Sequence, residues 1–184
     1  QALYLDNIFN GCSSLTSLTF KGNSKSSFSM ISAFEQCSSL ISLNLSLITR
    51  YISNMSRLFY ECFSLKDLQL YEIDNSNNII SGIKDMSYMF YNNSNLTSID
   101  ISIYDLSEVE FVNSMFYGCK SLREIQFYND SNITLYLQRM DNMFDLCENL
   151  ISLDLSIFNT QLVTKMNSLF KNCESLTIID IPHF

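Results

Sequence analysis

The sequence predicts an α/β fold: a solenoid of about seven stacked repeats, with a parallel β-sheet on one face and short helices on the other. The phrase F-x-x-C-x-x-L-x-x-L-x-L occurs seven times, with a few conservative replacements. Its phenylalanines follow one another at intervals of 25, 25, 31, 26, 28 and 26 residues. Periods in this range are typical of leucine-rich-repeat solenoids, in which each repeat buries its apolar face against its neighbours. The seven phenylalanines are Phe9, Phe34, Phe59, Phe90, Phe116, Phe144 and Phe170.

The first half of each repeat has the hydrophobic period of a helix. In the sixth repeat, apolar side chains stand at Met140, Met143, Phe144 and Cys147, which are positions i, i+3, i+4 and i+7. This spacing places them on one face of a short helix. A polar residue such as Asn54 precedes the apolar run of its repeat and suits the beginning of a helix.

The second half of each repeat changes to the alternation that is typical of a β-strand. Successive strands run in the same direction and are joined by a crossover, so we expect one parallel sheet. The expected strands are 17–20, 42–45, 67–70, 98–101, 124–127, 152–155 and 178–181. The two longest connections, 71–85 and 128–139, are expected to form loops on one flank of the solenoid.

Composition limits the classes of partner. The chain has 184 residues and a net charge of −8, and its Lys and Arg residues form no cluster. A nucleic-acid partner is therefore not expected, because phosphate binding needs clustered cations. No apolar run approaches the ~20 residues that a membrane-spanning helix needs, and no such span is expected. The 29 Ser and 19 Asn residues predict a polar, largely uncharged solvent face.

Six cysteines occupy the same position in their repeats, three residues after the core phenylalanine. They are Cys12, Cys37, Cys62, Cys119, Cys147 and Cys173, and the fourth repeat has Asn93 instead. A cysteine that recurs at one core position behaves as a small buried hydrophobic residue. We therefore expect six reduced, buried thiols rather than disulfides. Zinc is not expected, because no two cysteines have the close spacing of a structural zinc site.

No catalytic motif is found, and we expect a protein that is neither an enzyme nor dependent on a cofactor. The one histidine, His183, lies near the last residue of the sequence. Only four glycines are present, and none forms part of a phosphate-binding loop pattern. General acid and base chemistry would be left to carboxylates.

One polar position of the predicted strands forms the candidate partner-binding face. Its side chains should project from the same face of the sheet at a spacing of about 4.8 Å. They are Thr19, Asn44, Gln69, Asp100, Gln126, Asp154 and Asp180. A solvated polar face is the simplest interpretation. The alternative is a weak Ca²⁺ site between Asp154 and Asp180, since Ca²⁺ binds clustered oxygen ligands.

Three tyrosines, Tyr60, Tyr91 and Tyr117, directly follow a core phenylalanine. We expect them to lie above one another on the outer face of the solenoid. Exposed aromatic side chains of this kind are favoured at interfaces. Partial burial against the neighbouring repeat is the alternative.

Six N-x-S/T sequons are possible N-glycosylation sites if the chain follows a eukaryotic secretory route. They are Asn44, Asn54, Asn92, Asn95, Asn129 and Asn132. Asn129 and Asn132 lie in a long connection and are the preferred candidates. Asn92 and Asn95, close to the expected turn after a helix, come next.

The two ends of the sequence carry no recognisable polar cap. We expect a single solenoid over residues 1–184 that is either cut from a longer array or packed head to tail on identical copies. The residues expected at such an end-to-end contact are Leu3, Leu5, Ile179 and Ile181.

The sixth repeat also carries a resemblance to a known family. The segment MDNMFDLCENLISLDLSIFNTQLV, Met140 to Val163, resembles the Met-Phe-rich variant of the BspA-like leucine-rich repeats of bacterial and protist surface proteins. The resemblance extends over essentially the whole chain and departs from the pattern at Asn93, Phe28 and Tyr104. It implies a cell-surface or secreted protein, and it carries no catalytic residues over.

Two functions remain open from the sequence. The first is a non-enzymatic extracellular or cell-surface protein that acts in adhesion or protein–protein interaction, with a protein or a glycan as its partner. The second is a structural subunit that polymerises head to tail into an extracellular filament.

Overall fold

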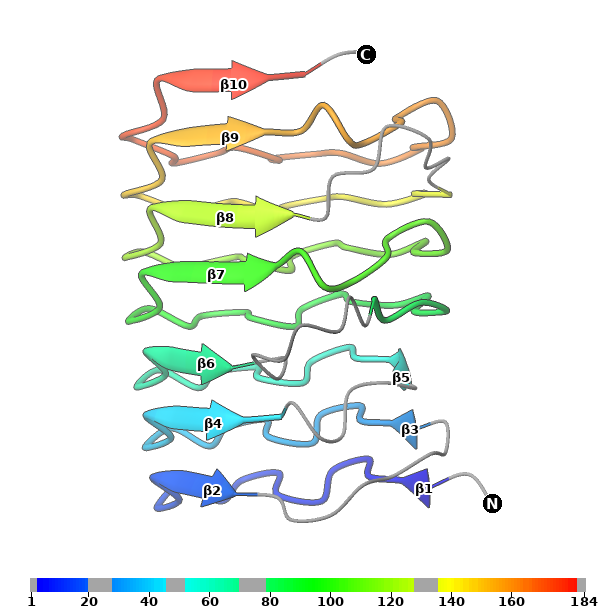
Figure 1. The fold of residues 1–184 in the computed structure, drawn as a ribbon. Coiled ribbons are helices and arrows are strands. Elements are labelled where there is room, and N and C mark those ends of the chain that lie inside the picture. Colours follow the sequence, from blue (N-terminus) through cyan, green and yellow to red (C-terminus); the bar gives the residue numbers. More distant parts are fainter. Residues whose placement is uncertain (1–2, 20–27, 46–51, 70–78, 128–135, 182–184) are drawn as a thin grey trace.

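The computed structural model describes residues 3–19, 28–45, 52–69, 79–127 and 136–181. In this part of the chain, ten short β-strands belong to successive repeats that lie one above another in a single stack (Figure 1). The strands are β1 (Leu3–Tyr4), β2 (Ser17–Thr19), β3 (Phe28–Ser29), β4 (Ser42–Asn44), β5 (Ile52–Asn54), β6 (Asp67–Gln69), β7 (Ser98–Ile101), β8 (Glu124–Phe127), β9 (Ser152–Asp154) and β10 (Ile178–Asp180).

Seven of these strands confirm the strand prediction. Strands β2, β4, β6, β7, β8, β9 and β10 each contribute one repeat to what we call the strand row, and each lies within its predicted range. All of the strand pairs in this row are parallel and in register, so that Ser17 pairs with Ser42 and Ser42 with Asp67. The repeating, parallel, strand-rich architecture is consistent with the predicted solenoid.

A second row of parallel pairing was not predicted. It begins with the sheet β1-β3-β5, on the flank opposite the strand row (Figure 1). Single bridges continue it through the later repeats, from Asn54 to Asp85, then to Phe111, Arg139 and Lys165. Only one to three residues per repeat take part, which is too short for an alternating hydrophobic pattern to reveal.

The predicted helices are not found among the described residues. The segments around the seven phenylalanines form turns instead, and we call these segments the turn row. In each turn, the residues two before and two after the phenylalanine have positive φ, as at Arg57 (56°) and Glu61 (59°). L-residues adopt this left-handed conformation singly, so an α-helix cannot continue through them. The apolar spacing of a short helix also suits this repeated turn, and the pattern alone does not separate the two.

Hydrogen bonds between repeats explain why the chain adopts these turns. The N–H groups of Arg57, Phe59 and Glu61 donate to carbonyl groups of the next repeat over distances of 2.8–2.9 Å. The residues between them donate within their own turn, as Tyr60 does to Arg57. Left-handed residues of this kind cost about 1–3 kcal/mol each, and persist where the surroundings determine them. Here three bonds between neighbouring turns recur at every one of the six repeat interfaces.

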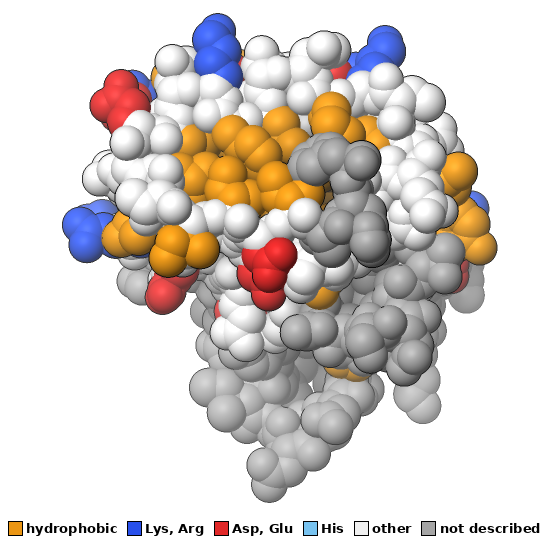
Figure 2. All heavy atoms as spheres, turned by 90° about the horizontal axis from the view of Figure 1, so that it is seen from above, with side chains coloured by type: hydrophobic (Ala, Val, Ile, Leu, Met, Phe, Trp, Pro, Cys, Tyr) orange, Lys and Arg blue, Asp and Glu red, His pale blue; other side chains and the backbone are white. Residues whose placement is uncertain are grey.

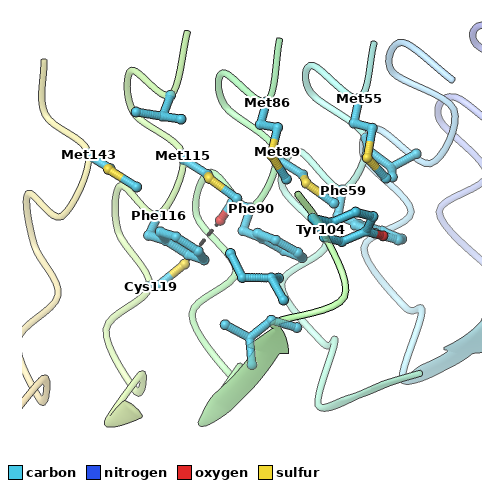
Figure 3. Packing of buried hydrophobic residues seen from close by; sticks show 14 of the residues in the cluster. Met55, Phe59, Met86, Met89, Phe90, Tyr104, Met115, Phe116, Cys119 and Met143 are labelled. Atoms are coloured by element: carbon cyan, nitrogen blue, oxygen red, sulfur yellow. Dashed lines mark hydrogen bonds between the residues drawn. The ribbon is translucent and has the colours of Figure 1, made fainter. Parts of the chain in front are cut away.

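The core follows the turn row as a column of aromatic rings. Neighbouring phenylalanine rings have centroids 5.2–5.8 Å apart and lie within 16° of parallel, from Phe9 to Phe170. Methionines of the same turns, including Met86 and Met115, pack beside the rings (Figure 3). Because these side chains are removed from water, each contributes about 1.5–3 kcal/mol of hydrophobic stabilisation.

The recurrent cysteine is a hydrogen-bond donor as well as a core residue. The thiol of Cys119 donates to the carbonyl oxygen of Phe90 in the preceding repeat at 3.1 Å (Figure 3). Cys37, Cys62, Cys147 and Cys173 make the same contact with their own preceding repeats. All six cysteines are free.

Burial of these thiols was predicted, and it holds for the inner repeats. Cys37, Cys62, Cys119 and Cys147 are buried. Burial raises the pKa of the Cys119 thiol to about 12. The prediction of burial is wrong for Cys12, which is exposed, and holds only in part for Cys173, which is partly buried; these two lie in the first and last repeats of the described stack.

The strand row, unlike the turn row, is interrupted. Its hydrogen-bonded sheets are β2-β4-β6, β7-β8 and β9-β10, so pairing among the described residues stops between β6 and β7 and again between β8 and β9. These two places are where the long connections 71–85 and 128–139 follow a strand. Both interruptions of the strand pairing therefore coincide with the two longest connections.

Candidate functional site

An open groove lies on the outer side of the strand row. Alternate residues of a strand face opposite sides of a sheet, so Leu43, Ile99 and Leu153 enter the core while their neighbours face solvent. The groove has a volume of about 690 Å³ and extends across β2, β4, β6, β7 and β8. Its polar lining consists of Ser17, Thr19, Ser42, Asn44, Lys66, Ser98, Asp100, Glu124 and Gln126.

The groove brings together four of the seven positions of the predicted partner-binding face. Thr19, Asn44, Asp100 and Gln126 line it, and Asn44 and Gln126 are exposed. The backbone of Gln69 is in register with Asn44 through the β4–β6 pair. Asp154 and Asp180 lie beyond the groove, in the β9–β10 pair. The predicted row is therefore one position in the repeat, and only part of it lines the groove.

Two of the predicted carboxylates have a local structural role. The Oδ1 atom of Asp100 accepts a hydrogen bond from the N–H of Ser102 at 2.9 Å. Asp154 does the same with Ser156 at 2.8 Å. Such Asx turns end a strand by replacing a backbone acceptor with a side-chain oxygen. These aspartates therefore help to shape the connection after the strand as well as its solvent face.

The alternative of a Ca²⁺ site rests on Asp154 and Asp180. The structure confirms that they are register partners on adjacent strands. Within the described chain, no group of three or more His, Cys, Asp or Glu side chains is placed to hold a metal ion. The pair therefore gains no third carboxylate from its surroundings, and Ca²⁺ normally binds six to eight oxygen ligands.

The groove offers non-covalent recognition chemistry. Its described lining combines hydroxyl, amide and carboxylate groups with one cation, Lys66. Hydroxyl and amide groups both donate and accept hydrogen bonds. Because they come from four strands, β2, β4, β7 and β8, an extended ligand could contact several repeats at once. Among the described residues there is also no helix with the length and hydrophobicity to cross a membrane.

The predicted end-to-end contact is placed only in part. Ile179 is 39% exposed, whereas Leu5 and Ile181 are partly buried and pack against the core. Leu3 lies in β1, and its side chain is outside the described residues. Figure 2 views the stack from the end at which β10 lies and shows apolar side chains gathered in its centre. The sequence reasoning missed the more exposed Ile178, which occupies the first position of β10 and is 65% exposed.

Four of the six sequons lie in described residues. Asn44 and Asn95 are exposed, and Asn54 and Asn92 are half-buried. A glycan on Asn44 would lie in the groove, so glycosylation there and partner binding would exclude each other. The two preferred candidates, Asn129 and Asn132, are outside the described residues.

The three predicted tyrosines form a column on the turn row. Tyr60 and Tyr91 have ring centroids 4.6 Å apart with an angle of 6° between the planes, and Tyr91 and Tyr117 have 4.6 Å and 5°. We call these three residues the tyrosine column. All three are half-buried, because each ring covers its neighbour. Burial raises the pKa of the Tyr60 and Tyr91 phenols.

An ion pair that the sequence reasoning missed covers one end of the tyrosine column. The guanidinium carbon of Arg57 lies 4.0 Å from the centre of the Tyr60 ring, a cation–π contact. Two nitrogens of Arg57 donate to the two carboxylate oxygens of Glu35 at 2.9 and 2.6 Å. These hydrogen bonds lower the pKa of Glu35. The 22-residue separation between Arg57 and Glu35 gave no sequence signal, because the two residues occupy different positions in their repeats.

A second groove, of about 470 Å³, lies beside the later bridges of the second row. Sequence reasoning missed it together with that row. Its lining is Lys84, Glu108, Glu110, Tyr136, Gln138, Leu162 and Thr164. The amide of Gln138 donates to Glu110 at 2.9 Å, which joins two neighbouring repeats across the groove floor.

Comparison with protein families finds one family that matches the chain in three overlapping ranges. Residues 3–84, 28–136 and 84–182 each match the family described as "Mycoplasma protein of unknown function, DUF285". The chain belongs to this family. Because the three DUF285 matches overlap and together reach from the first repeat to the last, they agree with the repeating architecture of the structure. Comparisons with curated proteins and with solved structures find no match.

Proposed function

We propose that this DUF285 protein is a non-enzymatic binding protein that acts in adhesion or protein–protein interaction at the cell surface or outside the cell. The groove on the strand row is its proposed binding surface, and its partner is a protein or a glycan. The observation that carries the proposal is the groove lining, in which polar side chains from β2, β4, β7 and β8, together with Lys66 immediately before β6, face one open channel.

The form of the groove suits an extended partner. Five strands at a spacing of about 4.8 Å give a surface at least 19 Å long. Such a length accommodates several sugar units or a short peptide. The small serine and threonine side chains of the lining leave the strand backbone accessible, while the carboxylates and Lys66 supply charged contacts. Several modest hydrogen bonds made together would give the specificity of recognition.

The proposed location rests on the sequence. The resemblance to BspA-like repeats implies surface or secreted proteins, and the chain is rich in Ser and Asn and acidic overall. Such a surface remains soluble at high concentration.

A binding assay with matched variants tests this function. The purified chain, labelled with a fluorophore, is applied to a glycan array and to cultured epithelial cells. Asn44→Arg combined with Gln126→Arg places two long cations in the groove and should abolish binding. Asn10→Arg combined with Gln161→Arg makes the same exchanges at exposed positions away from the strand row and should leave binding unchanged. Equal binding by both double variants would show that the groove is not the binding surface.

A second candidate function, end-to-end association of copies, is favoured by the apolar end of the stack (Figure 2). A head-to-tail contact of this kind generates an open filament. Sedimentation velocity over a wide concentration range should then show assembly that Ile179→Asp abolishes. Ile151→Asp is the matched control, because Ile151 is also exposed but precedes β9 within the stack. A monomer at every concentration would exclude this second function.

A further inference from the structure

The tyrosine column is the most ordered aromatic group outside the core. Its rings are parallel to within 6°, and the centroid distance of 4.6 Å is the same at both contacts. The phenylalanine rings of the core are farther apart, at 5.2–5.8 Å. The residues of the tyrosine column are only half-buried, unlike the phenylalanines of the core. A reagent in solution can therefore reach their phenols.

We propose that the tyrosine column is a site of oxidative cross-linking. In this modification, Tyr91 is joined to Tyr60 or to Tyr117 by a carbon–carbon bond between ring carbons ortho to the phenol oxygens, which is a dityrosine. The oxidant is hydrogen peroxide acting through a haem peroxidase.

The chemistry balances without any group from the protein itself. Each of two phenols loses one electron and one proton to the peroxidase, and the hydrogen peroxide is reduced to two molecules of water. The two tyrosyl radicals carry spin density on their ortho carbons and couple there. Each coupled ring carbon then releases its proton while the phenol oxygen takes one up, which restores both aromatic rings. The protein loses two hydrogen atoms for each cross-link.

Other tyrosines of the described chain lack this arrangement. Tyr104 is completely buried, and Tyr4 and Tyr136 are exposed without a stacked tyrosine partner among the described residues. The ring of Tyr88 is 5.9 Å from that of Tyr91 and tilted by 50°. Radical coupling requires two rings in contact, which the parallel column provides twice.

Sulfur side chains would compete for the oxidant, and most of them are protected. Met55, Met86, Met89 and Met115, which lie in the same repeats, are at most 1% exposed. Cys62 and Cys119 are also fully buried. Among the described residues of these three repeats, the accessible oxidisable side chains are therefore the tyrosine column and Tyr88, whose tilted ring lacks the parallel contact.

A Tyr60–Tyr91 bond would join two neighbouring repeats whose described strands are not paired with each other. Tyr60 belongs to the repeat of β6 and Tyr91 to that of β7, where the strand row is interrupted. On the turn side these repeats are held by hydrogen bonds, ring contacts and buried apolar side chains, without a covalent link. A covalent bond there would link the two repeats and reduce the conformational entropy of the unfolded chain.

Peptide mapping tests the proposal on the intact chain. After iodoacetamide has blocked Cys12 in the folded protein, a haem peroxidase and stoichiometric hydrogen peroxide are added. The expected product is a monomer that has lost two hydrogen atoms and has the blue fluorescence of dityrosine. Trypsin separates Tyr60, in residues 58–66, from Tyr91 and Tyr117, in residues 85–120. A Tyr60–Tyr91 bond joins these two peptides, whereas a Tyr91–Tyr117 bond forms a loop within the second.

Three variants make the result specific. Tyr91→Phe keeps an aromatic ring in the column but should abolish both cross-links. Tyr117→Phe should abolish the loop and retain the joined peptides, and Tyr104→Phe should change neither. Circular dichroism confirms that each variant is folded. The proposal is overturned if dityrosine forms only between molecules, if the joined peptides persist in Tyr91→Phe, or if Tyr4 and Tyr136 are oxidised while the column stays unmodified.

Discussion

The turn row and the strand row are parts of the same seven repeats, but they differ in continuity. The turn row carries three hydrogen bonds at each of the six repeat interfaces. Among the described residues, the strand row pairs within three separate sheets and is interrupted twice. The interruptions fall at the intervals of 31 and 28 residues, the two longest between successive phenylalanines. Contacts of the turn row are therefore kept where the repeat length changes, whereas strand pairing is not.

This division has a physical reason. Each turn is fixed by two left-handed residues, a stacked phenylalanine and bonds to both neighbours, so a change of length there would disturb every contact at once. An insertion after a strand displaces only the connection, and the strand loses a few hydrogen bonds worth about 0.5–1.5 kcal/mol each. The proposed binding groove lies on the more tolerant side, where loops and surface residues usually carry function.

The largest effect is expected when a ring is removed from the turn row. Phe90→Ala should lower the free energy of unfolding by about 3–5 kcal/mol, because it empties a buried site between two stacked rings. Ile99→Ala in β7, next to an interruption, should cost about 2 kcal/mol. Urea denaturation of both variants measures the difference. A larger loss for Ile99→Ala would contradict the greater importance of the turn row.

A second prediction tests the fit between neighbouring turns. Gly118 has φ +71°, and a Cβ atom added to it would collide with the side chain of Asn92 in the preceding repeat. Gly118→Ala should therefore cost about 2–3 kcal/mol, from the left-handed backbone and the collision together.

Gly11→Ala is the matched control for this variant. Gly11 has a similar φ of +76°, but nothing lies within 4 Å of an added Cβ atom. It should cost only about 1 kcal/mol, the backbone contribution. Equal unfolding free energies for the two variants would show that the Asn92 contact has no effect on stability.

The fourth repeat provides a stabilising prediction. Asn93 replaces cysteine there, and its Nδ2 atom still donates to the Phe59 carbonyl at 2.7 Å. Its Oδ1 atom is buried without a hydrogen-bond partner. Asn93→Cys should therefore raise the free energy of unfolding by about 1–2 kcal/mol, because it keeps the donor and removes the unpaired acceptor.

The reciprocal change is the control for Asn93. Cys62→Asn introduces the same amide at an equivalent buried position and should lower stability by a similar amount. Thermal denaturation of both variants compares them directly. A loss of stability in Asn93→Cys would show that the Oδ1 atom has a favourable contact in solution.

The smallest effect is expected for the Arg57–Glu35 ion pair, which is partly exposed. Arg57→Met should lower the free energy of unfolding at neutral pH by less than about 1 kcal/mol. Hydrogen bonds from Arg57 lower the pKa of Glu35 below its usual 4.5, so the unfolded chain takes up this proton more readily than the folded one. The stabilisation is therefore present above pH 4.5 and is lost as the pH falls through the lowered pKa.

Urea midpoints at several pH values test this ion pair. The difference between the natural chain and Arg57→Met should disappear in acid. High salt should also reduce it, because the pair is partly exposed to solvent. A difference that stays constant down to low pH would assign the effect to packing of the arginine on Tyr60 rather than to charge.

Particular residues show how much of the structure could be predicted from the sequence. The period and the alternating strand pattern were sufficient to place all seven strands of the strand row, because hydrophobic spacing records burial directly. Position within the repeat also placed Tyr60, Tyr91 and Tyr117 in one column. For the candidate site, the same reasoning placed Asn44, Asp100 and Gln126 on one face. It did not separate them from Asp154 and Asp180, which lie beyond the groove, because the extent of a groove depends on the surface that several repeats form together.

By itself, the sequence determined the number of repeats, their order and the side chains that share a position in each repeat. These properties follow from the spacing of apolar residues within a repeat, and this spacing recurs in every repeat. Only the tertiary structure decided that the phenylalanine segments are turns rather than helices, and that Arg57 pairs with Glu35. Both depend on bonds to a neighbouring repeat, and the energy of a contact between repeats is not contained in the local pattern of either one.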